Sequence, residues 1–318
     1  MKKRTDFSKL KKIPKDLSEV NEQNLSIIIE EIKQRLKSDY LFPEEVSSLC
    51  SALDLAVKNQ NFSQIQTPSE LVKQLTKTLQ HVINDKHLRV QLPSEIHDSS
   101  IAKRPLRGIE KVEILQENIG YISIESFLPL SLCENTLLGA MQFVHDTRAL
   151  ILDLRKCRGG SADSANLLLS FLFPENNRLL LKTYFRPQNQ EVQVWTSWTP
   201  YKYKKPIYAL TSSSTFSAGE HFVFALKINK QATIIGENTG GGAHPVAVNI
   251  HEIGVAITIP IGRTFDPISG DDWEGGGISP DIECLAEEAF EKALAHIKNN
   301  IPELNHSIPL KRMVVKPR

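Results

Sequence analysis

The chain has 318 residues, of which 41% are apolar and 24% are charged, and its formal net charge at pH 7 is +1. This composition is typical of a globular protein with room for two domains. A net charge so close to zero supplies no global field that would attract nucleic acid, so no nucleic-acid partner is expected. No run of 18 apolar residues occurs, so no membrane span is expected either.

Both ends of the chain are basic. Residues 1–15 carry seven Lys or Arg against one Asp, and residues 311–318 carry four more. No apolar stretch follows the basic start, so the chain as given predicts a cytoplasmic protein, or a secreted or periplasmic one if a leader has been removed. The four cysteines are scattered without a CxxC pair, which favours reduced thiols over a disulfide framework or a zinc site, and no cofactor is expected.

Residues 17–86 show helical periodicity. Apolar residues recur at spacings of three and four from Leu25 to Leu36, and similar stripes follow over 43–57 and from Ser69 onwards. Three amphipathic helices with short links predict a small helical domain, which we place at residues 1–86.

The period changes after residue 86. Continuous apolar runs at Ala149–Leu154 and Pro206–Leu210 are typical of strands covered on both faces, and each precedes a predicted helix. Strands alternating with helices predict a layered α/β domain over residues 87–300, followed by a basic tail at 301–318. The other expected elements are strands at 112–115, 121–124, 234–235, 246–250 and 255–259, and helices at 130–146, 162–172, 216–228 and 286–299.

The most informative segment is Ile207–Lys227, in which a buried strand runs through a cluster of hydroxyl residues into an apolar helix. A serine at such a turn lies near unsatisfied helical amides that favour developing negative charge, as an acyl-transfer nucleophile requires. The alternative is that these hydroxyls only cap the helix and form the turn. A second segment, Ala149–Ser161, ends in consecutive glycines whose amides could approach a ligand oxygen, or which could simply form a strand–helix turn.

Four segments together resemble the C-terminal-processing (tail-specific) serine protease family: ALILDLRKCRGG, TFSAGE, GENTGGG and WEGGGISPD. The resemblance spans about residues 80–290 and is strongest to the branch that contains the tricorn core and interphotoreceptor retinoid-binding protein. It implies an α/β (α+β) fold: an N-terminal three-helix domain and a ClpP/crotonase-like layered strand–helix spiral without a PDZ insertion. It also implies a serine peptidase that acts on unfolded or short polypeptides, including near C-termini, and that forms a homo-oligomer in many relatives.

The resemblance carries three catalytic roles onto this chain. Ser217 matches the nucleophile, and Glu274 matches a carboxylate that orients the base. Relatives with a Ser-Lys dyad have their lysine where this chain has Gly242, so that mechanism is not available from this position. The tricorn-like branch uses a histidine instead, which corresponds to His87, although Lys86 stands where that branch has a supporting serine.

This set has a consistent chemical logic. An imidazole can take and return the proton of a serine, and a buried carboxylate stabilises the imidazolium. Ala218, with Gly159 or Gly160, would supply backbone N–H donors to the oxyanion. His221, one turn after the nucleophile, and His244, in a glycine-rich loop, are alternative bases.

Two other functions remain open at this point. The retinoid-binding resemblance allows a module that keeps the fold and binds a hydrophobic ligand or a peptide without catalysis. A crotonase-like acyl-CoA enzyme shares the strand–helix spiral, but the sequence shows no basic CoA-binding loop. Asp153, Arg155 and Glu220 are interpreted as structural supports around the site.

Overall fold

The structure, a computed structural model, describes residues 15–96 and 106–301. Most of the predicted basic N-terminal segment and nearly all of the predicted C-terminal tail lie outside these ranges. Within them, no helix is both long enough and apolar enough to cross a membrane.

Three helices build the N-terminal part, as predicted: α1 (Glu22–Asp39), α2 (Val46–Lys58) and α3 (Pro68–Val82). Asn21 caps α1 by accepting a hydrogen bond from the N–H of Asn24 at 2.8 Å. Thr67 and Glu70 form a reciprocal capping box at the start of α3, which satisfies two of its free N–H groups. A short 3₁₀ turn, η2 (Pro43–Glu45), precedes α2.

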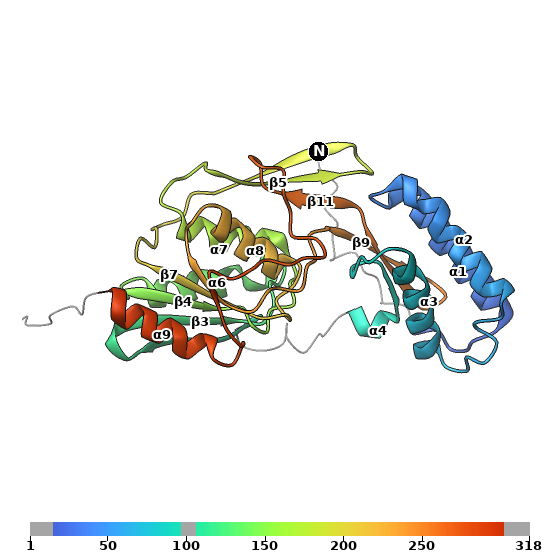
Figure 1. Ribbon diagram of the computed structural model, residues 1–318, viewed down its shortest axis with the longest axis horizontal. Helices are drawn as coiled ribbons and strands as arrows, with labels where there is room; N and C mark the ends of the chain where they lie inside the picture. Colours follow the sequence, from blue (N-terminus) through green and yellow to red (C-terminus); the bar gives the residue numbers. More distant parts are fainter. Residues whose placement is uncertain (1–14, 97–105, 302–318) are drawn as a thin grey trace, which may run out of the picture.

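These helices pack against a small sheet formed by β1 (Arg89–Gln91), β10 (Val255–Pro260) and β9 (Val246–His251). One buried cluster joins the apolar stripes of the three helices to Val255, Ile257 and Ile259 of β10. Segments more than 150 residues apart therefore share a core, and Figure 1 shows α3 lying beside this sheet. The domain division at residue 86 stays a prediction.

The larger part is built on a six-stranded sheet with the strand order β12-β8-β7-β4-β3-β2. All neighbouring strands are parallel except β2, which is antiparallel to β3. The strands are β2 (Ile109–Leu115), β3 (Ile119–Ile124), β4 (Ala149–Asp153), β7 (Ile207–Thr211), β8 (Thr233–Gly236) and β12 (Ile282–Glu283).

Helices cover both faces of this sheet (Figure 1). In β4, Leu150 and Leu152 face the cluster formed with α6 (Leu130–Val144), α7 (Ala162–Leu172) and α8 (Ala218–Ile228). Alternate side chains of the same strand belong to the cluster formed with α9 (Ala289–Asn300) on the opposite face. Because successive side chains of a strand point to opposite faces, a strand covered on both sides reads as continuously apolar. This arrangement confirms the predicted layered α/β core, and no PDZ-like domain intervenes among the described residues.

A third sheet was not predicted from the sequence. It consists of the hairpin β5 (Leu179–Phe185) and β6 (Gln190–Trp195), with β11 (Gly262–Phe265) paired to β5. β6 is largely solvent-exposed, so its alternation of apolar and polar residues carries little burial signal. The short elements α4 (Pro93–Ile96) and η3 (Gln116–Asn118) complete the described fold.

Candidate active site

Ser217 occupies the turn between β7 and α8. It is the residue before the helix and has φ 53° and ψ −120°, a conformation that non-glycine residues rarely adopt. Such a backbone costs about 1–3 kcal/mol and persists where the surrounding structure holds it in place. The turn presents the hydroxyl at the positive end of the α8 dipole, where an anion is stabilised.

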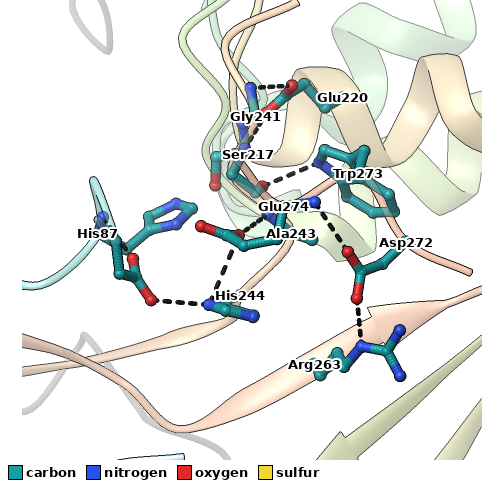
Figure 2. A network of polar contacts seen from close by, with 12 residues as sticks. His87, Ser217, Glu220, Gly241, Ala243, His244, Arg263, Asp272, Trp273 and Glu274 are labelled. Atoms are coloured by element: carbon teal, nitrogen blue, oxygen red, sulfur yellow. Dashed lines mark hydrogen bonds and ion pairs between the residues drawn. The ribbon is translucent and has the colours of Figure 1, made fainter. Parts of the chain in front are cut away.

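Glu220 holds this turn from beneath. Its fully buried carboxylate accepts hydrogen bonds from the N–H of Ser217 at 2.9 Å and from the hydroxyl of Thr239 at 2.5 Å. It also accepts from the N–H groups of Gly241 and Gly242 at 2.6 and 2.8 Å. Burial raises the pKa of Glu220, and the four donors oppose that rise. One side chain thus ties the nucleophile turn to the glycine-rich loop 239–242, as Figure 2 shows in part.

The glycine loop after β4 lies directly against the nucleophile. A Cβ on Gly159, whose φ is +103°, would lie 2.7 Å from the Cβ of Ser217 and 3.0 Å from the nitrogen of Ala218. Only glycine fits this close approach. The N–H of Gly159 faces the thiol of Cys157, whereas the N–H groups of Gly160 and Ala218 donate to no acceptor within the described ranges.

His87 lies in the loop between α3 and β1, beside the nucleophile turn. Its ring packs against that of Phe216 with 4.6 Å between the centroids, and its side chain extends toward Glu274 and Ser217 in Figure 2. The residue is only 3% exposed, and neither ring nitrogen has a hydrogen-bond partner among the described residues. Burial lowers the pKa of His87 to about 4, so the ring is neutral at physiological pH.

The glycine at position 242 makes room for this histidine. A Cβ added to Gly242 would lie 2.6 Å from the Cε1 atom of His87 and 2.4 Å from the ring of Phe216. Any longer side chain at this position would occupy the same volume as the imidazole. A histidine ring therefore fills the space beside Gly242, the position that the resemblance equates with the lysine of Ser-Lys relatives.

Glu274 reaches the site from the loop after β11. Its Oε2 atom accepts a hydrogen bond from the N–H of Ala243 at 2.6 Å, while its buried Oε1 atom has no partner within the described part of the chain. Burial raises the pKa of Glu274 to about 7, although the nearby His244 opposes that rise. Arg263 pairs with Asp272, which accepts from the N–H of Glu274 and so steadies this loop (Figure 2).

Two further groups belong to the site. Asp85 accepts from the N–H of His87 at 2.8 Å through Oδ1, and its Oδ2 atom lies 2.7 Å from Nδ1 of His244. The same Nδ1 atom is 3.5 Å from Oε2 of Glu274. The sequence alone assigns no role to Asp85 and offers His244 only as an alternative base. In the structure the Nδ1 atom of His244 lies between two carboxylates, those of Asp85 and Glu274.

The remaining candidates point elsewhere. His221 directs its Nε2 atom to the side-chain oxygen of Asn166 on α7, at 2.8 Å, and burial lowers its pKa to about 4. Asp153 pairs with Arg155 and accepts a hydrogen bond from the hydroxyl of Tyr121 at 2.8 Å. These contacts brace α7, β4 and β3 and do not face the nucleophile.

Ser217, His87 and Glu274 lie in the same region of the structure (Figure 2), but no hydrogen bond joins His87 to either of the other two. Ligand-type atoms of Asp85, His244 and Glu274 lie within 4.8 Å of one another. Since Nδ1 of His244 is already engaged with Asp85, we describe this group as a hydrogen-bonded ion cluster.

Comparison with known proteins agrees with this architecture. Residues 118–284, more than half of the chain, match the family described as Peptidase family S41. Residues 18–121 match the N-terminal domain of Peptidase_S41 in eukaryotic IRBP.

Individual proteins with similar sequences are C-terminal-processing proteases. The chain is 27% identical over 233 residues to a carboxy-terminal-processing protease of Bartonella bacilliformis, covering 68% of this chain and 50% of that protein. It is 28% identical over 179 residues to the chloroplastic carboxyl-terminal-processing peptidase 1 of Arabidopsis thaliana, covering 56% and 36%. The chain therefore spans half or less of the length of these curated relatives.

A solved structure extends the likeness to the whole fold. A putative peptidase from Parabacteroides merdae aligns with a TM-score of 0.60 at 20% sequence identity, over 89% of this chain and 99% of the other. The predicted resemblance is confirmed, and the chain belongs to peptidase family S41, the family of the C-terminal-processing proteases, with the N-terminal domain type of interphotoreceptor retinoid-binding protein.

Proposed function

We propose that this protein is a serine peptidase that cleaves polypeptides through an acyl-enzyme. In this proposal Ser217 is the nucleophile, His87 is the general base and Glu274 orients and stabilises the protonated base. The relatives named above are carboxyl-terminal-processing enzymes, and we extend that preference, for unfolded chains or chain ends, to this protein.

One observation carries the proposal: three buried polar atoms on residues around the strained nucleophile turn have no hydrogen-bond partner among the described residues. They are both ring nitrogens of His87 and the Oε1 atom of Glu274. An unpaired buried polar group costs about 1–3 kcal/mol, so such a group is kept where it has a task. A rotation of the His87 side chain that brings one nitrogen to Glu274 and the other to Ser217 would satisfy all three. Catalytic hydrogen bonds are often loose before substrate binds and tighten in the complex.

The protonation states fit these roles. The lowered pKa of His87 keeps its ring neutral, which leaves a nitrogen free to accept the serine proton. Once that proton is transferred, a carboxylate at Glu274 would stabilise the imidazolium. Because the pKa of Glu274 is raised to about 7, we expect activity to increase as the pH rises through this value.

The oxyanion of the tetrahedral intermediate would be held by backbone donors. The N–H groups of Ala218 and Gly160 have no acceptor among the described residues, and Gly159 allows the loop after β4 to approach the nucleophile turn. Removal of one such donor typically costs roughly 10²–10³ in rate.

Self-association of the chain is a further proposal, which light scattering on the purified protein would test.

Labelling with a fluorophosphonate probe together with peptide hydrolysis tests the proposal. We expect the wild-type chain to be labelled and to cleave an unfolded polypeptide, and we expect Ser217→Ala to lose both properties. His87→Ala and Glu274→Gln should lower the rate by roughly 10⁴-fold, the size of the loss when a triad member is disturbed. Ser214→Ala, in the same hydroxyl cluster, is the matched control and should keep its activity.

Two results would contradict the proposal. Labelling that survives Ser217→Ala would place the reactive group elsewhere. A folded wild-type chain that neither reacts with the probe nor cleaves any unfolded polypeptide would favour the alternative of a ligand- or peptide-binding module.

A further inference from the structure

A cluster of buried and partly buried charged groups lies beside His87. Asp85 and Glu274 direct carboxylate oxygens at the same atom, Nδ1 of His244, at 2.7 and 3.5 Å. The side chains of Asp85 and His244 are only 3% and 4% exposed, and that of Glu274 is 18% exposed. Two acids and one base therefore share a site that water hardly reaches.

The cluster is connected to the proposed base through the backbone. Asp85 uses one carboxylate oxygen to hold the N–H of His87 and the other to hold the ring of His244. Figure 2 shows His244 linked by a dashed line to Glu274, and Glu274 in turn extends toward His87. His244 thus bridges two groups that lie on either side of the proposed base.

The surroundings of His244 come from several elements. The ring of Phe42, from the segment before η2, packs edge-on against the imidazole with 5.5 Å between centroids. The charged and titratable groups that face or influence the ring are Asp85, His87, Asp272 and Glu274. Burial, the largest single effect, lowers the pKa of His244, but the hydrogen bond to Asp85 and the nearby carboxylate charges together outweigh it and raise the pKa.

The balance of charges explains why a cation is needed here. Two buried carboxylates so close together cannot both stay ionised without a compensating charge, because one of them would take up a proton. With His244 protonated, Asp85 and Glu274 can both be ionised, and the cluster carries one net negative charge. That charge is neutralised when His87 accepts the serine proton.

We propose that His244 is a positioning residue of the peptidase: its imidazolium, held by Asp85, keeps Glu274 ionised and directed at His87. The inference rests on the proposed function, because it assigns His244 a task in the same reaction. His244 does not touch the substrate or the serine, and acts only through Glu274 and Asp85.

The substitution His244→Asn removes the positive charge of the side chain but keeps a hydrogen-bond donor. The amide of Asn keeps a donor close to the position of Nδ1, so the contact to Asp85 can persist while the positive charge is lost. We expect the acid limb of the kcat profile to move to higher pH by about one unit, the lower range for loss of a nearby opposite charge. At pH 7 this shift lowers kcat by about fivefold, because the ionised fraction of Glu274 falls from about one half to about one tenth, with KM changed less than about twofold, and activity recovers at high pH.

Controls and contrary outcomes are defined on the same chain. His251→Asn, the same substitution on β9 away from the cluster, should leave the profile unchanged. Reactions contain EDTA, so that no adventitious metal contributes. A kcat that falls equally at every pH, or a change confined to KM, would overturn the proposal.

A second measurement does not depend on activity or on the stability of the variant. In Ser217→Ala protein with ¹³C-labelled histidine, NMR should show that His244 titrates above the ordinary histidine value of 6.5. Titration at or below that value overturns the proposal. If the wild-type chain is neither labelled nor active, the peptidase assignment and the catalytic role of His244 both fail, whereas the NMR result still decides whether the charged cluster exists.

Discussion

Two glutamates near the nucleophile turn have opposite surroundings: Glu220 is fully buried, whereas the side chain of Glu274 is 18% exposed. Glu220 is saturated: it accepts hydrogen bonds from three backbone N–H groups and one hydroxyl. Glu274 accepts a single backbone hydrogen bond, and its Oε1 atom has no partner within the described residues. The first carboxylate is fixed by its partners and gives the turn its shape. The second keeps free capacity at an energetic cost, as expected of a group that must respond to a proton moving nearby.

The largest expected effect comes from removing the saturated carboxylate. Glu220→Ala leaves four buried donors without acceptors, and we expect the free energy of unfolding to fall by about 4 kcal/mol. At pH 7, Glu274→Gln keeps an acceptor for Ala243 and removes a partly buried ionisable group, so its cost should stay within about 1 kcal/mol. Urea unfolding of both variants measures the difference. Equal losses would show that the two carboxylates do not differ as described.

The next effect is a pH dependence that belongs to Glu274. Its pKa is raised from 4.5 to about 7 in the folded chain, so the folded state binds a proton more readily than the unfolded state does. Stability from this group is therefore present at low pH and is lost as the pH rises from about 4.5 to about 7.

A pair of unfolding measurements isolates this contribution. Relative to the wild type, Glu274→Gln should gain about 2–3 kcal/mol of unfolding free energy between pH 4.5 and pH 8. Since the other titrating groups are common to both proteins, their contributions cancel in the difference. A difference that does not change with pH would contradict the raised pKa.

A smaller effect tests the space that holds His87. Gly242→Ala places a Cβ 2.6 Å from the imidazole and 2.4 Å from the ring of Phe216, and overpacking of this kind costs about 1–3 kcal/mol. We expect hydrolysis to fall by roughly 10²-fold, because a small misplacement of a catalytic group has effects of this size. Gly276→Ala is the matched control, since its Cβ would meet nothing within 4 Å. Equal activity of the two variants would argue against His87 as the base.

The smallest effect concerns Lys86, which stands where the tricorn-like branch has a supporting serine. Its Nζ atom donates a hydrogen bond to the carbonyl of Gly240 at 2.6 Å and so ties the His87 loop to the glycine loop. Because this lysine is exposed, Lys86→Ala should cost about 0.5 kcal/mol and reduce kcat only a few-fold. A loss of activity as large as that of His87→Ala would instead give the lysine a direct role.

The predicted helices and strands are confirmed where the local spacing of apolar residues indicated them. The helices over residues 22–82 and the strands at Ala149–Asp153 and Ile207–Thr211 follow from apolar spacing, because each buries a regular stripe or both faces. The hairpin β5–β6 did not follow, because it buries little on β6 and its pairing with β11 comes from residues about 80 positions later. The local spacing of apolar residues carries no information about such a long-range strand pairing.

For the site, the chain by itself determined that a serine stands in a strand-to-helix turn, and the resemblance implied that Gly242 stands where Ser-Lys relatives have a lysine. Only the tertiary structure decided how the distant groups combine: Asp85 with His244, 159 positions apart, and Glu220 with the loop at Gly241. It also decided that His87 and Glu274 have buried atoms without partners among the described residues, and that His244 contacts two carboxylates. Burial and long-range charge pairing set these properties, and both arise only when the helical part, the small sheet and the α/β core pack together.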